Sequence, residues 1–240
     1  MDAIIQQLKS LRLSHASDAL EQQRIQPATY AELGFEERLG LILDHELVNR
    51  DQTKIQRLKR QAKLRLSASG NQLDYRPERG LKRAMMGELL SGTYLQKRQN
   101  VLITGATGAG KTYVACALAE QACEQHCPSR YYRLNRLLDD LSSSRLDGSY
   151  QKLLLSLSKK KLLVIDDWGM EKLSQEHASN LLEVLEDRYQ ECSTIIISQL
   201  PVKEWHEMID NSTIADAILD RLVHQSHRIE LRGESMRKLA

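Results

Sequence analysis

The chain has 240 residues, of which 41% are hydrophobic and 28% are charged, and its formal net charge is +2. This is the composition of an ordinary globular protein, and it excludes fibrous, collagen-like and wholly disordered chains. No stretch approaches the roughly 20 apolar residues of a membrane span, and the first residues do not read as a secretory signal. We therefore expect a cytoplasmic protein without a membrane partner.

The amino-terminal third is predicted to be a small all-α domain over residues 1–66. Apolar residues recur at helical spacing over 4–25 and, after Pro27, over 30–66. Residues 67–71 read Ser-Ala-Ser-Gly-Asn, and Pro77 and Gly80 prevent a helix from resuming, so we interpret 67–80 as a linker that precedes a second domain at 81–240.

A basic segment ends the helical part. Between positions 50 and 65 a single acid, Asp51, stands among seven basic residues: Arg50, Lys54, Arg57, Lys59, Arg60, Lys63 and Arg65. The segment is either a solvated helix face or a surface that contacts the phosphates of DNA. Charge alone does not decide between these interpretations.

The second domain alternates strand-like and helical segments. Short runs rich in β-branched or aromatic residues lie at 101–104, 130–134, 162–166, 194–198 and 227–231. The segments between them are long enough for crossover helices. This pattern predicts an α/β domain with a mainly parallel sheet.

The first of these strands leads into a phosphate-binding loop. The residues Gly105, Ala106, Thr107, Gly108, Ala109, Gly110, Lys111 and Thr112 match the pattern Gly-x4-Gly-Lys-Thr, and a helical run follows from Tyr113, which we include in the nucleotide site. Glycines let successive backbone amides point at phosphate oxygens, and the next helix adds its positive end. Lys111 is expected to pair with the β- and γ-phosphates of ATP, and the Thr112 hydroxyl to hold Mg²⁺.

A second motif supplies carboxylates. The apolar strand 162–165 ends in Asp166 and Asp167, at the carboxyl edge of the sheet where such folds bind ligands. Asp166 is predicted to hold Mg²⁺ through water, and Asp167 to orient or deprotonate the attacking water.

Two further candidates each have two interpretations. If the strand 194–198 lies between the loop strand and the acidic strand, Ser198 and Gln199 face the γ-phosphate; otherwise Ser198 simply ends a strand. Arg221 is either an arginine finger that acts on a neighbouring subunit's nucleotide, or one half of an ordinary ion pair with Asp220 or Glu230.

Segments over nearly the whole length carry a family resemblance: 35–39, 57–64, the loop 105–112, 165–171, 198–201, 215–222 and 233–238. In them the chain resembles the IstB-like ATP-binding proteins, bacterial helpers of insertion-sequence transposases that are related to DnaC-like helicase loaders among the AAA+ ATPases. The last two segments and the helical amino-terminal pattern single out this family, since many ATPases share the loop.

The resemblance implies a fold and a function. The fold is a P-loop NTPase of the AAA+ initiator and loader type, an αβα sandwich with a five-stranded parallel sheet, in which 135–144 and 149–157 form the additional helical element. Arg221 then matches the finger, and Ser198 with Gln199 matches sensor 1. The function implied is that of an ATP-dependent oligomer on double-stranded DNA that assists a transposase. A helicase loader is the close alternative, and a monomeric P-loop kinase or small-molecule NTPase is the third.

The chain also departs from the pattern of many AAA+ proteins. Its acidic strand ends in Asp-Asp instead of Asp-Glu, so we expect slow ATP hydrolysis. About ten residues follow the last strand, which leaves no room for a helical lid, and Arg237 is at best a substitute for the lid's arginine. Trp168 and Glu171 have no assigned chemical role.

Overall fold

The computed structural model describes residues 3–233 and residue 236. The chain forms two compact units, which divide between Arg57 and Leu58. Residues 67–80 were expected to be a linker, but the buried side chains of Ala68, Leu73 and Arg79 make this segment part of the second unit. Its apolar side chains are buried in the core of the second unit, so the segment is not a solvent-exposed linker.

The first unit is helical. It contains α1 (Ala3–Ser10), α2 (Ser14–Ile25), a short 3-10 helix (Pro27–Tyr30) and most of α3 (Phe35–Ala62). The helical pattern over 4–25 is split in two because Arg12 takes a left-handed conformation with φ 60°. A small core of Ala16, Ala19 and Ile42 holds the unit together.

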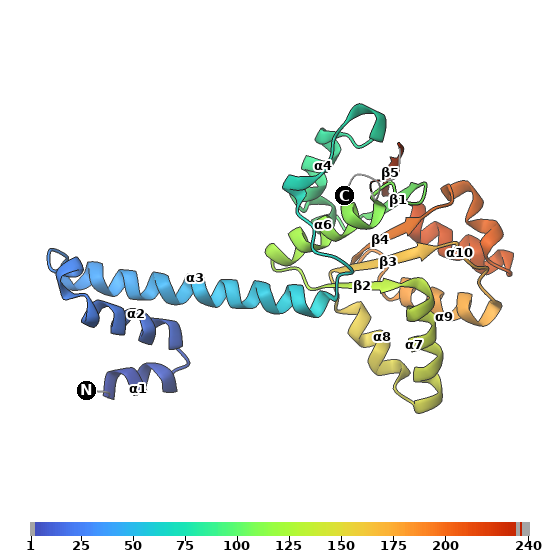
Figure 1. Ribbon diagram of the computed structural model, residues 1–240. Coiled ribbons are helices and arrows are strands. Elements are labelled where there is room, and N and C mark those ends of the chain that lie inside the picture. Colours follow the sequence, from blue (N-terminus) through green and yellow to red (C-terminus); the bar gives the residue numbers. More distant parts are fainter. Residues whose placement is uncertain (1–2, 234–235, 237–240) are drawn as a thin grey trace. The chain divides into compact units, whose positions relative to one another are not determined.

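The second unit is built on a five-stranded parallel sheet with the order β2-β3-β4-β1-β5 (Figure 1). The strands are β1 (Asn100–Gly105), β2 (Ser129–Arg133), β3 (Leu162–Trp168), β4 (Ser193–Ser198) and β5 (Ser226–Leu231). The predicted strands are confirmed, and so is the position of β4 between the loop strand and the acidic strand.

Helices cover both faces of the sheet, as Figure 1 shows. The helices of this unit are α4 (Arg83–Leu90), α5 (Thr93–Gln96), α6 (Lys111–Glu124), α7 (Leu134–Asp147), α8 (Tyr150–Ser158), α9 (Gln175–Glu186) and α10 (Ser212–Val223). Alternate residues of β1 point to opposite cores: Val101 and Ile103 pack with α4 and α6, and Leu102 packs with α7, α9 and α10. This arrangement confirms the αβα sandwich.

Short 3-10 helices complete the unit at Gly70–Gln72, Pro77–Arg79, Val202–Glu204 and His206–Met208. In the described part of the chain, no helix combines the length and the apolarity that crossing a membrane requires.

Candidate functional site

The loop between β1 and α6 has a backbone that only glycine fits at two positions. Gly105 has φ 143°, and a Cβ atom there would lie 2.1 Å from the carbonyl oxygen of Leu231 on β5. Gly110 has φ 87°, and a Cβ atom there would lie 2.9 Å from Nη2 of Arg79. The loop therefore brings its backbone close to its neighbours and delivers the first amides of α6 to the carboxyl edge of the sheet.

Lys111 begins α6 and bends back over the loop. Its Nζ donates hydrogen bonds to the carbonyl oxygens of Gly105 at 2.6 Å and Ala106 at 2.9 Å. Burial lowers the pKa of the Lys111 ammonium, and the nearby Asp166 and Asp167 oppose that shift. The bonds to neutral carbonyls leave the ammonium charge available to an anion in the loop.

Asp166 contacts three other side chains of the site. Its Oδ2 accepts hydrogen bonds from Thr112 Oγ1 at 2.8 Å and from Tyr131 hydroxyl at 2.7 Å. Nη1 of Arg65 lies 3.7 Å from the same oxygen. Burial, followed by the bond to Asp166, raises the pKa of Tyr131, so its hydroxyl remains a donor. The hydroxyl of Thr112 and the carboxylate of Asp166 are hard oxygen ligands placed side by side, which fits Mg²⁺.

Asp167 follows in a strained turn. The pairing of β3 with β4 is irregular between Ile165 and Trp168, and Asp167 has φ 64°, which is costly for a residue with a side chain. Its carboxylate pairs with Nε of Arg133 at 3.3 Å, at the end of β2. The second predicted carboxylate is thus partly exposed and held by an arginine.

The two candidate sensor residues differ in what they contact. Ser198 Oγ donates to the carbonyl oxygen of Trp168 at 2.8 Å and accepts from the amide of Leu200 at 3.0 Å, so its bonds join the ends of β3 and β4. Gln199 Oε1 accepts from Thr107 Oγ1 at 2.7 Å. Of the pair, Gln199 is the residue whose side chain reaches the phosphate-binding loop.

Trp168 packs against Trp205 next to the acidic turn, with the two rings tilted by 42°. The ring centroids lie 5.3 Å apart, both rings are buried, and Nε1 of Trp205 donates to the carbonyl oxygen of Leu200 at 3.1 Å. This packing gives Trp168 a structural role. Glu171 is exposed, and the structure assigns it no chemical role.

A cavity of about 460 Å³ opens among these groups. The loop, Tyr113, both aspartates, Ser198 and Gln199 line it, together with Arg65. Its volume is in the range of sites for small ligands and cofactors.

The sequence matches the family described as IstB-like ATP binding protein over residues 6–240. The chain belongs to this family. An insertion sequence ATP-binding protein of Sinorhizobium fredii is 47% identical over 207 residues, which are 86% of this chain and 84% of that protein.

Solved structures show the same fold at low identity. The DnaC helicase loader superposes with a TM-score of 0.56 and 15% identity over 69% of this chain and 97% of that one. AMPPCP-bound DnaA from Aquifex aeolicus superposes with a TM-score of 0.61 and 13% identity over 74% of this chain and 54% of that one. The IstB-like chain therefore shares its α/β fold with the DnaC helicase loader and with DnaA.

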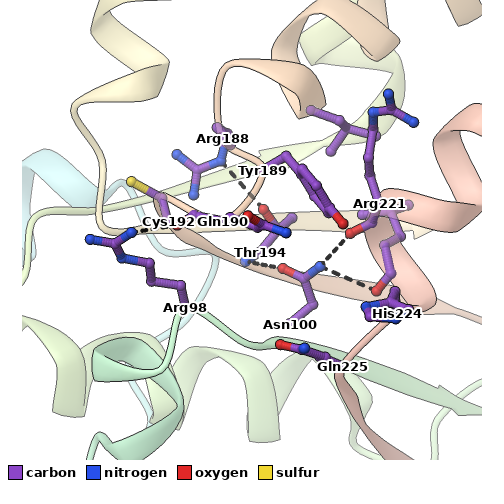
Figure 2. A pocket seen from close by; sticks show the side chains of 12 residues that line it. Arg98, Asn100, Arg188, Tyr189, Gln190, Cys192, Thr194, Arg221, His224 and Gln225 are labelled. Carbon is purple, nitrogen blue, oxygen red and sulfur yellow. Dashed lines mark hydrogen bonds between the residues drawn. The ribbon is translucent and has the colours of Figure 1, made fainter.

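In this IstB-like protein Arg221 lies far from the loop of its own chain. The side chain of Asn100, the first residue of β1, donates to the carbonyl oxygen of Arg221 at 2.8 Å, so Arg221 is at the amino edge of the sheet (Figure 2). Its guanidinium forms an ion pair with Glu186 on α9 and donates to the carbonyl oxygen of Ala217. The ion-pair partners expected for Arg221 were therefore wrong, because the side chain turns toward α9.

Arg188 is a buried cation beside Arg221 in the same small pocket (Figure 2). Its guanidinium donates to the carbonyl oxygens of Leu157, Lys160 and Ser193 at 2.6 to 2.7 Å and to Thr194 Oγ1 at 3.3 Å. Burial lowers its pKa to about 10. Arg188 thus joins the end of α8 to the start of β4.

The predicted DNA-contacting residues separate into three groups. Arg50 pairs with Glu46, and Lys59 pairs with Glu120 and Glu124 on α6. Arg65 lines the nucleotide cavity. The basic segment in which it lies gave no indication of this position. The remaining four are exposed: Lys54, Arg57, Arg60 and Lys63.

Sequence reasoning missed four residues near the site. Tyr131 and Arg133 lie on β2. Their place at the site could have been inferred only if β2 had been expected to pair with the acidic strand β3. Arg79 donates to the carbonyl oxygen of Ala109 at 2.6 Å and so stabilises the phosphate-binding loop. It belongs to no recognised sequence motif. Arg65 is the fourth. Arg237 lies outside the described residues.

Proposed function

We propose that this protein is an ATPase that binds double-stranded DNA, assembles on it when ATP is bound, and assists the transposase of an insertion sequence. The observation that carries the proposal is the contact between Thr112 and Asp166 beside the phosphate-binding loop, at a cavity of nucleotide size. Family membership supports ATP as the ligand, and the name of the Sinorhizobium relative supports the insertion-sequence context.

The residues of the loop bind the triphosphate. Loop amides and the ammonium of Lys111 hold the β- and γ-phosphates, and Thr112 with Asp166 would hold Mg²⁺, directly or through water. When bound, Mg²⁺ supplies positive charge that offsets the charge on the phosphate oxygens.

Asp167 and Gln199 act on the water that attacks the γ-phosphate. The water oxygen forms a bond to phosphorus, the bond to the ADP oxygen breaks, and Asp167 takes the water's proton. Asp167 must first leave Arg133, and its side chain is one methylene shorter than glutamate, so hydrolysis is slow. Gln199, held by Thr107, orients the γ-phosphate or the water; Ser198 supports the turn from which Gln199 projects.

Arg221 of a neighbouring subunit completes the site. Its position at the amino edge of the sheet keeps it away from its own nucleotide, and it would exchange its pairing with Glu186 for the nucleotide of another subunit. A shared site of this kind makes ATP a link between subunits, and an assembled array presents many weak phosphate contacts to DNA at once.

The deciding experiment combines duplex-DNA binding with size analysis in the presence of ATP, ADP or no nucleotide. We expect larger assemblies and tighter DNA binding with ATP, and a Lys111→Ala protein that shows neither. A wild-type protein that binds ATP but stays monomeric and indifferent to DNA contradicts the proposal.

A helicase loader is the second candidate, favoured by the fold shared with the DnaC helicase loader. The two functions differ in their partner. Co-purification with a transposase supports the first, and co-purification with a hexameric replicative helicase supports the second.

A further inference from the structure

Arg65 places a second cation of this chain at the nucleotide cavity. It follows the end of α3 at Ala62, and its Nη1 lies 3.7 Å from Oδ2 of Asp166. Its side chain is 35% exposed, and it lines the same cavity as Lys111 and Thr112. We propose that Arg65 contacts the γ-phosphate of bound ATP and so makes the site favour ATP over ADP. This inference rests on the proposed function, in which the cavity binds ATP.

The charges around the cavity support such a contact. The charged side chains that line it are Lys111 and Arg65 against Asp166 and Asp167, so their charges cancel before ligand binds. The magnesium complex of ATP carries one more negative charge than that of ADP, and that charge resides on the γ-phosphate. Lys111 is already buried in the loop, whereas the guanidinium of Arg65 is partly exposed and able to reorient.

Arg65 has two present partners: Asp166, at a long ion-pair distance, and the hydroxyl of Tyr131, which itself donates to Asp166. A separation of 3.7 Å is an ion-pair distance, beyond that of a good hydrogen bond. Asp166 Oδ2 already accepts two hydrogen bonds, from Thr112 and Tyr131, so the carboxylate does not need the arginine. Arg65 also competes with any divalent cation that Thr112 and Asp166 hold, because like charges at one carboxylate oxygen repel.

A phosphate is the better partner for this side chain. The planar guanidinium presents paired donors that match two phosphate oxygens, and such charge-assisted pairs are stronger than neutral hydrogen bonds. Arg65 lies in the segment that leaves α3, so a change of partner from Asp166 to phosphate alters how that segment is tethered. The presence of the γ-phosphate is thereby sensed at the end of α3.

The test is the affinity for a slowly hydrolysed ATP analogue and for ADP, measured by calorimetry with Mg²⁺ on the full chain. For Arg65→Ala we expect about tenfold or greater loss of affinity for the ATP analogue and little change for ADP. Arg65→Lys should restore part of the loss, because lysine keeps the charge without the paired donors. The matched control is Arg136→Ala, which removes an arginine of α7 that is 80% exposed and should change neither affinity.

Two results overturn the inference. Equal losses for the ATP analogue and ADP mean that Arg65 acts through Asp166 or through folding. Unchanged affinities in Arg65→Ala mean that it does not reach the nucleotide. A wild-type protein that binds neither nucleotide contradicts the proposed function itself, and the ADP titration of each variant reports whether its site is intact.

Discussion

Thr112 and Asp166 are joined by a hydrogen bond of 2.8 Å, which connects the first turn of α6 to the end of β3. The two side chains come from segments more than fifty residues apart in the sequence. Their contact brings the phosphate-binding loop and the acidic strand into one site.

Replacing Thr112 with Val should remove most of the dependence of ATP binding on Mg²⁺. The hydroxyl is lost as a ligand, and Asp166 loses a charge-assisted hydrogen bond, which costs about 1 to 3 kcal/mol. The measurement is ATP affinity with Mg²⁺ and with EDTA. Thr112→Ser keeps the hydroxyl and should behave as wild type; a Thr112→Val protein with the wild-type response to Mg²⁺ would show that Thr112 is not a ligand.

Replacing Arg221 with Ala should leave nucleotide binding intact and abolish hydrolysis, because the finger stabilises charge only in the transition state. Glu186→Gln is the matched variant: it removes the partner of Arg221 but keeps the arginine, so hydrolysis should persist. Steady-state phosphate release at equal protein concentration checks both variants. Normal turnover in Arg221→Ala would show that this arginine is not a finger and only forms a structural ion pair with Glu186.

The triple variant Arg57→Ala, Arg60→Ala, Lys63→Ala should weaken DNA binding by a similar factor for every sequence tested. It should also flatten the salt dependence, with a change in slope of about 1 for each lost phosphate contact. The readout is the dissociation constant for duplex DNA over a series of salt concentrations. Lys59→Ala is the control, since Lys59 already pairs with two carboxylates on α6. An unchanged slope in the triple variant identifies the segment as a solvated face.

Replacing Arg188 with Met should lower the free energy of unfolding by about 3 kcal/mol or more. The change removes a charged donor from three carbonyl oxygens, of which those of Leu157 and Ser193 are buried, and a hydrogen bond to a charged group is worth about 1.5 to 3 kcal/mol. Urea unfolding measures the loss. ATP affinity of the folded variant should match wild type, because Arg188 lies at the amino edge of the sheet; a stable variant would contradict the structural role.

Local sequence patterns predicted those parts of the site that are formed by residues adjacent in the sequence. The loop needs glycines at fixed spacing, and the acidic strand needs apolar residues followed directly by Asp166, so both motifs can be recognised in the sequence. The strand order had no local signal, but it could be anticipated from the resemblance to a family.

Contacts between distant segments could not be predicted in this way. Arg65 belonged to a basic run whose periodicity suggested a helix surface, yet it lies beyond the end of α3 and lines the cavity. The partner of Arg221 was sought among nearby residues, whereas α9 supplies Glu186. Each of these pairings depends on how helices pack against the sheet, which hydrophobic periodicity does not encode.

The packed pair of Trp168 and Trp205 provides an intrinsic fluorescence signal. The chain has two tryptophans, and both lie at this one place, next to the turn that carries Asp167. Tryptophan emission therefore comes from a single location beside the turn that carries Asp167, and we expect that titrations with nucleotide can be followed by fluorescence without attaching a dye.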